Sequence, residues 1–65
     1  MHDNDIPGEK LRKEREDAKV SLNDLARAMG KHRSTVWRYE GLASVEVDIV
    51  NRYRDSLAKL TKVAA

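Results

Sequence analysis

The chain of 65 residues has no cysteine, one proline, three glycines and two histidines. Without cysteine it can form no disulfide and offers no thiolate, which fits a reducing, cytosolic compartment. His2 and His32 lie in separate segments, and there is no glycine-rich phosphate loop, so no metal site or nucleophile–base pair is recognisable. We therefore expect no enzyme, no metal or other cofactor, and no small-molecule ligand.

Long apolar runs are missing as well, because none approaches the roughly 20 residues that span a bilayer. The first five residues are polar and acidic, unlike a signal peptide. A chain of this length suffices for one domain, residues 1–65, and buries only roughly 60% of the surface that its unfolded form exposes. We expect a domain of modest stability, no membrane partner and a cytoplasmic location.

The positive charge is concentrated in one segment. The chain carries 13 basic and 11 acidic side chains, a net charge of +2. No acid lies between residues 27 and 38, which hold Arg27, Lys31, Arg33 and Arg38. A cation cluster beside a neutral-to-acidic body is typical of an anion-binding face, although a solvated charged surface gives the same pattern.

The apolar spacing predicts an all-α chain. No stretch alternates long enough for a strand, since the only candidate, residues 45–49, continues into a helical pattern. Helices are predicted over residues 7–18, 22–29, 33–40 and about 45–62. Asp5 is the expected cap of the first helix, with Pro7 tolerated in its first turn, and Ser44 is the expected cap of the last.

The second helix has the clearest start and end. Ser21 and Asp24 are spaced as a capping box, in which the hydroxyl and the carboxylate each bond a backbone N–H at the helix start. Val20 and Leu25 flank this start as a hydrophobic staple. Gly30 follows the helix, where glycine most easily takes the left-handed conformation. The third helix begins less clearly, because His32 at its cap position is a mediocre capping residue.

Residues 20–41, VSLNDLARAMGKHRSTVWRYEG, resemble the Cro and lambda-repressor-like (xenobiotic-response-element type) helix-turn-helix family. Ala26 stands where the two helices cross, Gly30 at the sharp turn, and Val36 in the core of the recognition helix. Residues 7–15 resemble the first helix of the family, and the resemblance covers roughly residues 7–50. It implies a compact four-helix lambda-repressor-like domain, with five helices as the alternative, and a motif at 22–41.

In this family an arginine of the first helix often pairs with the glutamate that closes the recognition helix. The matching residues here are Arg15 and Glu40. A structural ion pair between them accounts for an arginine on the inward stripe of the first helix, because a partly buried charge needs a partner. A surface arginine in a charge-rich helix is the alternative.

The resemblance also implies that helix 33–40 lies in the major groove of DNA. Arg33 and Arg38 can each bond guanine O6 and N7, or contact phosphate instead. Trp37 can contact a thymine methyl or a sugar, fold back into the core, or belong to a protein interface. Ser34 suits base or phosphate equally. The residues expected at the DNA are Arg33, Ser34, Trp37 and Arg38 on the recognition helix, His32 and Lys31 in the turn, and Ser21 and Asn23 at the start of the second helix.

Two of these details stay open. His32 suits a phosphate contact or a plain solvent-exposed turn equally well. Leu22 and Lys31 depart from the family pattern, which commonly has a polar DNA-contacting residue at the first position and an apolar residue at the second. The motif is therefore expected to contact DNA somewhat differently from its relatives.

These features predict a sequence-specific transcriptional regulator that binds double-stranded DNA, a repressor of phage or bacterial type, in the cytoplasm of a bacterium or of a phage-infected host. A homodimer on a two-fold site is expected, because one module contacts only a few base pairs. Leu57 and Leu60 are the dimer candidates, whereas Ile49, Val50 and Tyr53 are expected to close the core. The alternatives are a DNA-binding subunit of another assembly, such as an antitoxin or an architectural or recombination factor, and a helix-turn-helix that binds protein.

Overall fold

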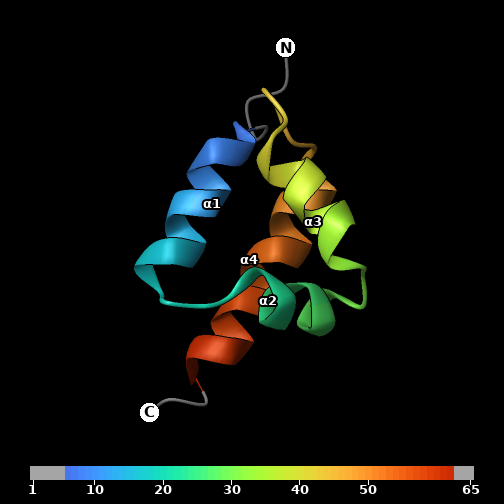
Figure 1. Cartoon of the computed structure of the whole chain (residues 1–65). Coiled ribbons are helices and arrows are strands. Elements are labelled where there is room, and N and C mark those ends of the chain that lie inside the picture. Colours follow the sequence, from blue (N-terminus) through green and yellow to red (C-terminus); the bar gives the residue numbers. More distant parts are fainter. Residues whose placement is uncertain (1–5, 63–65) are drawn as a thin grey trace.

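The computed structural model describes residues 6–62. It contains four helices: α1 (Gly8–Asp17), α2 (Leu22–Met29), α3 (Arg33–Glu40) and α4 (Val47–Lys62). In Figure 1, α1 and α3 stand on either side of α4, and α2 packs across α4 at the level of the end of α1. Within residues 6–62 the only β pairing is an isolated bridge, so the all-α prediction is confirmed.

The helix-turn-helix has the predicted bounds. Ser21 Oγ accepts the backbone N–H of Asp24 at 3.1 Å and caps α2. Gly30 ends α2 with φ at 71°, the left-handed region in which glycine avoids the steric cost of a Cβ. His32 does cap α3, since its Nδ1 accepts the backbone N–H of Ser34 at 3.1 Å. The two helices therefore meet at a sharply defined turn.

The first helix begins one residue later than expected. Pro7 occupies the N-cap position with no side-chain cap, and the predicted cap Asp5 lies outside the described residues. The backbone N–H of Gly8 donates to the carbonyl of Leu42 at 2.9 Å. A Cβ at Gly8 would overlap the backbone of Tyr39 and Glu40, so the absence of a side chain lets α1 abut the end of α3.

The last helix also begins later than predicted, at Val47 and not near residue 45. The backbone N–H of Val45 donates to the carbonyl of Ile6 at 2.7 Å, in an antiparallel bridge. This pairing buries Val45 completely and holds its backbone outside the helix. The carbonyl of Glu46 accepts from the backbone N–H of Val50 at 2.9 Å, as at the start of a helix, and the capping role of Ser44 stays a prediction.

One core lies between the four helices. Leu57 is only 8% exposed and belongs to this core, so the single chain already accounts for a side chain that was expected at a dimer contact. Leu60 and Ile49 are half-buried and pack against the same cluster. The buried apolar residues are Leu11, Leu25, Ala26, Val36, Val45, Val50, Tyr53 and Leu57.

Candidate nucleic-acid interface

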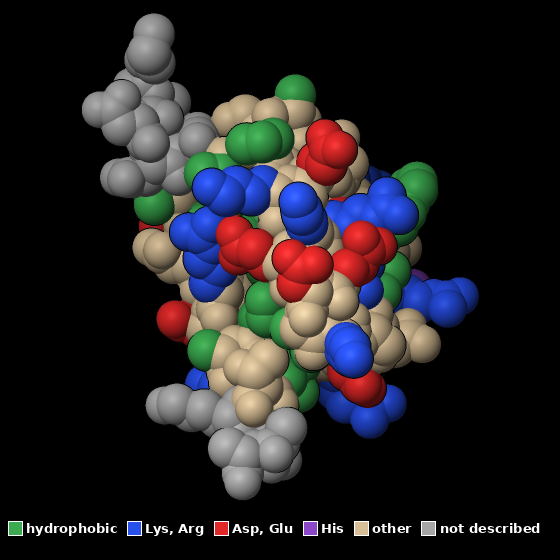
Figure 2. Space-filling view, turned by 90° about the vertical axis from the view of Figure 1, so that its left-hand side faces the viewer, with side chains coloured by type: hydrophobic (Ala, Val, Ile, Leu, Met, Phe, Trp, Pro, Cys, Tyr) green, Lys and Arg blue, Asp and Glu red, His purple; other side chains and the backbone are tan. Residues whose placement is uncertain are grey.

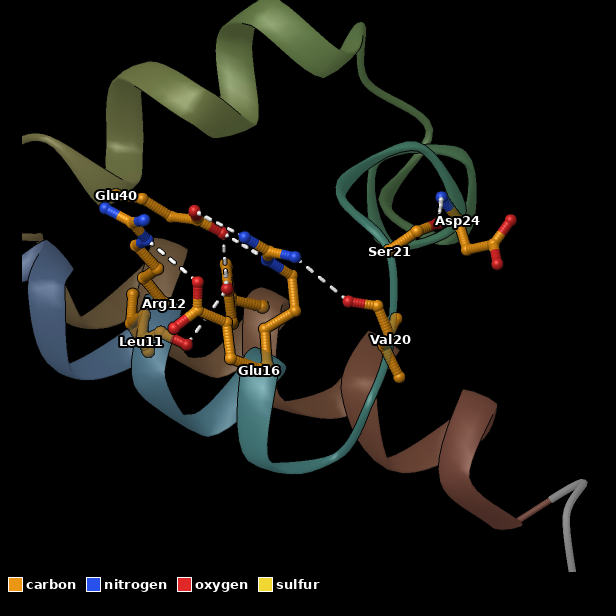
Figure 3. A network of polar contacts seen from close by, with 9 residues as sticks. Leu11, Arg12, Glu16, Val20, Ser21, Asp24 and Glu40 are labelled. Atoms are coloured by element: carbon orange, nitrogen blue, oxygen red, sulfur yellow. Dashed lines mark hydrogen bonds and ion pairs between the residues drawn. The ribbon is translucent and has the colours of Figure 1, made fainter.

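A buried polar network joins the end of α3 to α1 and α4 (Figure 3). Arg15 Nε donates to Glu40 Oε2 at 2.8 Å and Arg15 Nη2 to Glu40 Oε1 at 3.2 Å, so the pair expected from the family resemblance is present. The Arg15 and Glu40 side chains are 12% and 4% exposed. Arg15 Nη1 also donates to the carbonyl of Val20 at 2.9 Å, which fixes the chain just before α2.

Tyr53 completes this network from α4. Its hydroxyl donates to Glu40 Oε2 at 2.6 Å, and the same proton is shared with the carbonyl of Leu11 at 3.0 Å. Burial, together with the hydrogen bond to Glu40, raises the pKa of Tyr53 far above its ordinary value. The hydrogen bond to Glu40 likewise raises the pKa of Arg15, against the opposing effect of burial. Among the described residues, no buried side-chain polar atom is left without a partner.

The exposed face of α3 borders this network. Arg33, Ser34, Trp37 and Arg38 are all exposed, while Val36 points into the core. Trp37 is 68% exposed, so it does not fold back into the core. It borders a hollow of about 240 Å³ whose other lining residues are Arg12, Arg15, Glu40 and Gly41, so Trp37 lies beside the Arg15–Glu40 pair. A large apolar ring in the middle of a polar helix face is thus left available to a partner.

A second hollow, of about 350 Å³, lies between α2 and α3. It brings together four of the residues expected at DNA, and it adds Arg27, which the candidate set omitted although it belongs to the charge cluster. Its lining residues are Asn23, Ala26, Arg27, Lys31, His32 and Arg33. Three cations in one concave surface suit an anion such as a phosphate.

The four cations between residues 27 and 38 make no ion pair within residues 6–61. Arg27, Lys31, Arg33 and Arg38 are exposed, and the ion pairs of the described chain involve other residues. The side of the molecule toward α1 differs, since Figure 2 shows basic and acidic side chains interspersed there. The charge asymmetry of the sequence is therefore also an asymmetry in space.

His32 and Ser34 form a contact that the sequence did not predict. His32 Nδ1 lies 2.7 Å from Ser34 Oγ, in addition to accepting the Ser34 backbone N–H. The nearest sequence signal is the position of His32 directly before the helix, but whether a histidine nitrogen accepts depends on its tautomer. The role that the structure gives His32 is therefore that of the N-cap of α3.

The two departures from the family pattern have structural explanations. Leu22 is half-buried and packs against the core, so this position supports the fold. Lys31 is exposed, and its backbone N–H donates to the carbonyl of Ala26 at 2.9 Å, which closes the turn without any apolar side chain. Ser21 and Asn23 are exposed at the start of α2, and Ser21 already serves as its cap.

Other kinds of site find no support in the part of the chain that the structure describes. Nowhere in it do three or more His, Asp or Glu side chains gather as metal ligands would. None of its helices combines the length and the apolar character needed to cross a bilayer.

The comparison with protein families agrees with this geometry. The profile of a family described as a helix-turn-helix domain matches residues 8–53, from the start of α1 into the middle of α4. The chain belongs to the helix-turn-helix family. This membership is consistent with the Cro and lambda-repressor-like resemblance and indicates DNA binding. No curated protein and no solved structure matches the chain.

Proposed function

We propose that this helix-turn-helix protein is a sequence-specific regulator of transcription, a repressor of phage or bacterial type, that reads the major groove of double-stranded DNA with α3. The observation that carries the proposal is the coincidence of exposure and charge. The face of α3 that points away from the core bears Arg33, Ser34, Trp37 and Arg38. Beside it lies the hollow in which α2 and the turn contribute Arg27 and Lys31.

This arrangement suits the way such motifs dock. When a recognition helix enters the major groove, its first residues reach base edges while the preceding helix contacts the backbone. Arg33 at the first turn of α3 then has the geometry to bond a guanine edge, and Arg38 reaches either a base or a phosphate. The hollow with Arg27, Lys31 and His32 then faces the DNA backbone at the start of α3, and a helix start favours anions. Trp37, between the two arginines, contacts a thymine methyl or a sugar.

The proposal is tested with two variants that remove equal charge. Arg33→Ala with Arg38→Ala removes two cations from α3, and Lys13→Ala with Arg54→Ala removes two from the α1–α4 side. Fluorescence anisotropy on duplexes selected from a random library measures the dissociation constant of each. We expect the α3 variant to lose about 100-fold or more in affinity, since each arginine contact to a base is worth about 1–3 kcal/mol. The control variant should lose little.

The same selection separates the other functions. Equal losses in both double variants would refute reading by α3. Tight binding with no sequence preference would instead indicate an architectural or recombination factor, or another DNA-binding subunit such as an antitoxin. An absence of binding to any duplex would leave the helix-turn-helix as a protein-binding module and overturn the proposal.

We further propose that the protein acts as a homodimer on a two-fold site, because two modules one helical turn apart supply the specificity that one lacks. Leu57 is committed to the core, so Leu60, which is half-buried near the end of α4, is the remaining candidate contact. Sedimentation of the wild type and of Leu60→Glu, with and without a selected duplex, tests this. A wild type that stays monomeric at high concentration and binds DNA one to one would contradict it.

A further inference from the structure

We infer that Ser34 reads an exocyclic amino group of adenine or cytosine and does not contact phosphate, because its hydroxyl already donates its hydrogen bond to His32 Nδ1. This inference rests on the proposed function and adds to it the chemical class of the group read at one position. It follows from two contacts of the same nitrogen. His32 Nδ1 lies 3.1 Å from the backbone N of Ser34 and 2.7 Å from its Oγ.

The first contact fixes the tautomer. A backbone N–H can only donate, so Nδ1 must accept and therefore carries no proton. In the second contact the proton must then come from Ser34, whose hydroxyl donates to Nδ1. A neutral imidazole with an unprotonated Nδ1 carries its proton on Nε2. The two contacts together set the direction of both hydrogen bonds.

The hydroxyl of Ser34 is consequently an acceptor toward anything outside the protein. A serine hydroxyl has one proton and two lone pairs, and here the proton is already engaged. Phosphate oxygens, guanine O6 and N7, and thymine O4 are acceptors that need a donor. Adenine N6 and cytosine N4 are donors, and they alone in the major groove match the remaining lone pairs. The sequence left base and phosphate as equal partners for Ser34, and the hydrogen-bond directions leave only the amino group of a base.

His32 gains the complementary role. Its Nε2–H is a donor on an exposed side chain, in a hollow whose charged residues are Arg27, Lys31 and Arg33. That donor suits a phosphate oxygen of the backbone. His32 is therefore a positioning residue for Ser34, and its own contact is expected to be with the DNA backbone.

The experiment combines base analogues with protein variants. In a selected duplex, adenine is replaced by purine, or cytosine by pyrimidin-2-one, one base at a time, which deletes single amino groups. We expect one such deletion to weaken wild-type binding about twofold to tenfold, the value of one hydrogen bond. The same deletion should have no effect on Ser34→Ala. His32→Asn, which retains a capping acceptor, should keep the sensitivity, and His32→Ala, which frees the hydroxyl, should lose it.

A readout without DNA separates this inference from the proposed function. In two-bond ¹H–¹⁵N spectra, with His32 signals identified by their loss in His32→Asn, Nδ1 should be the unprotonated nitrogen. A protonated Nδ1 would overturn the inference, even for a protein that binds DNA as proposed. Amino deletions that reduce the affinity of the wild type and of Ser34→Ala equally would also overturn it. So would a duplex lacking one guanine O6 that weakens binding of the wild type but not of Ser34→Ala. Failure to bind any duplex would overturn the proposed function and the inference with it, whatever the spectrum shows.

Discussion

On the α1 and α4 side of the molecule, arginines face carboxylates, with Arg12 bonded to Glu16 at 3.1 Å and Arg54 to Glu14 at 2.7 Å. Between residues 27 and 38, on α2, the turn and α3, four cations have no carboxylate partner among residues 6–61. On the paired side, the carboxylates next to the arginines offset their charge and weaken the field there. The 27–38 segment tolerates mutual repulsion and keeps its positive potential, which is useful only toward an anionic partner.

The buried network connects these two regions. Glu40 is the last residue of α3, yet its carboxylate faces inward to Arg15 and Tyr53. The inward end of α3 is therefore held by charge pairing, while its outward face remains open. Interactions that stabilise the domain and interactions expected at DNA thus involve different side chains of one short helix, although Trp37 and Glu40 line the same hollow. The predictions below test that separation, starting with the largest effect.

The first prediction concerns the buried pair. Glu40→Ala leaves Arg15 charged and partly buried without its carboxylate, and breaking a buried pair in this way costs about 3–5 kcal/mol. For a domain this small, we expect most of the population to unfold at 25 °C, as measured by circular dichroism and urea titration. A cycle with Arg15→Ala and the double variant should show a smaller combined loss than the sum. Additive losses would show that the pair does not act as a unit.

The second prediction concerns Tyr53 and alkaline pH. Tyr53→Phe removes a hydrogen bond to a charged group and should cost about 1.5–3 kcal/mol at neutral pH. Because the pKa of Tyr53 is raised in the folded state, its contribution is complete below the ordinary tyrosine pKa of about 10 and is lost as the pH rises above it. The variant should therefore lose less stability than the wild type between pH 9 and 11, values chosen as roughly one unit on either side of that pKa.

Tyr39→Phe is the matched control for this effect. Tyr39 is half-buried on α3 and is outside the Glu40 network. Its variant should keep the alkaline slope of the wild type in urea titrations at each pH. A wild-type slope in Tyr53→Phe would refute the assignment of the proton to Tyr53.

The third prediction concerns the junction of α1 with α3. Gly8→Ala places a Cβ against the backbone of Tyr39 and Glu40, which cannot move aside easily, and overpacking of this kind costs about 1–3 kcal/mol. Gly41→Ala is the control, because its new Cβ would lie 3.6 Å from the nearest atom, an ordinary contact. We expect thermal unfolding to show a lower midpoint for the first variant alone. Equal midpoints would mean that α1 does not abut α3 so closely.

The smallest effect is expected from the surface pairs. Arg54→Ala breaks a pair whose side chains are 44% and 31% exposed, and such pairs contribute about 0.2–1 kcal/mol. Arg33→Ala with Arg38→Ala removes cations that have no partner, so urea titration should show no loss, or a small gain from relieved repulsion. A loss of stability larger than that of Arg54→Ala would show that the α3 arginines are structural and would break the comparison.

Local signals in the sequence sufficed for the helix-turn-helix itself. Ser21 and Gly30 mark the ends of α2 because capping and the left-handed turn depend on neighbouring residues only. The pairing of Arg15 with Glu40 followed from the family resemblance. The exposed set on α3 follows from helical spacing, since Val36 fixes which side faces inward.

Long-range contacts account for what the sequence could not predict. Val45 leaves α4 because it pairs with Ile6, which lies 39 positions earlier. The hydroxyl of Tyr53 reaches the carbonyl of Leu11, 42 positions away, and no local pattern indicates that contact. The apolar stripe of α4 did not distinguish core from interface at Leu57, because both require the same spacing. At His32, the capping role depends on a tautomer that the sequence does not specify.

The most direct test of the central claim is the salt dependence of duplex binding. If the four cations of the 27–38 segment contact phosphates or displace their counterions, the logarithm of the association constant against the logarithm of the salt concentration should have a slope of about −3 to −4 for each bound module. Arg33→Ala with Arg38→Ala should reduce that slope by about 2 per module, whereas Lys13→Ala with Arg54→Ala should leave it unchanged. Equal changes in the two variants, or a wild-type slope near zero, would contradict the assignment of DNA binding to this surface.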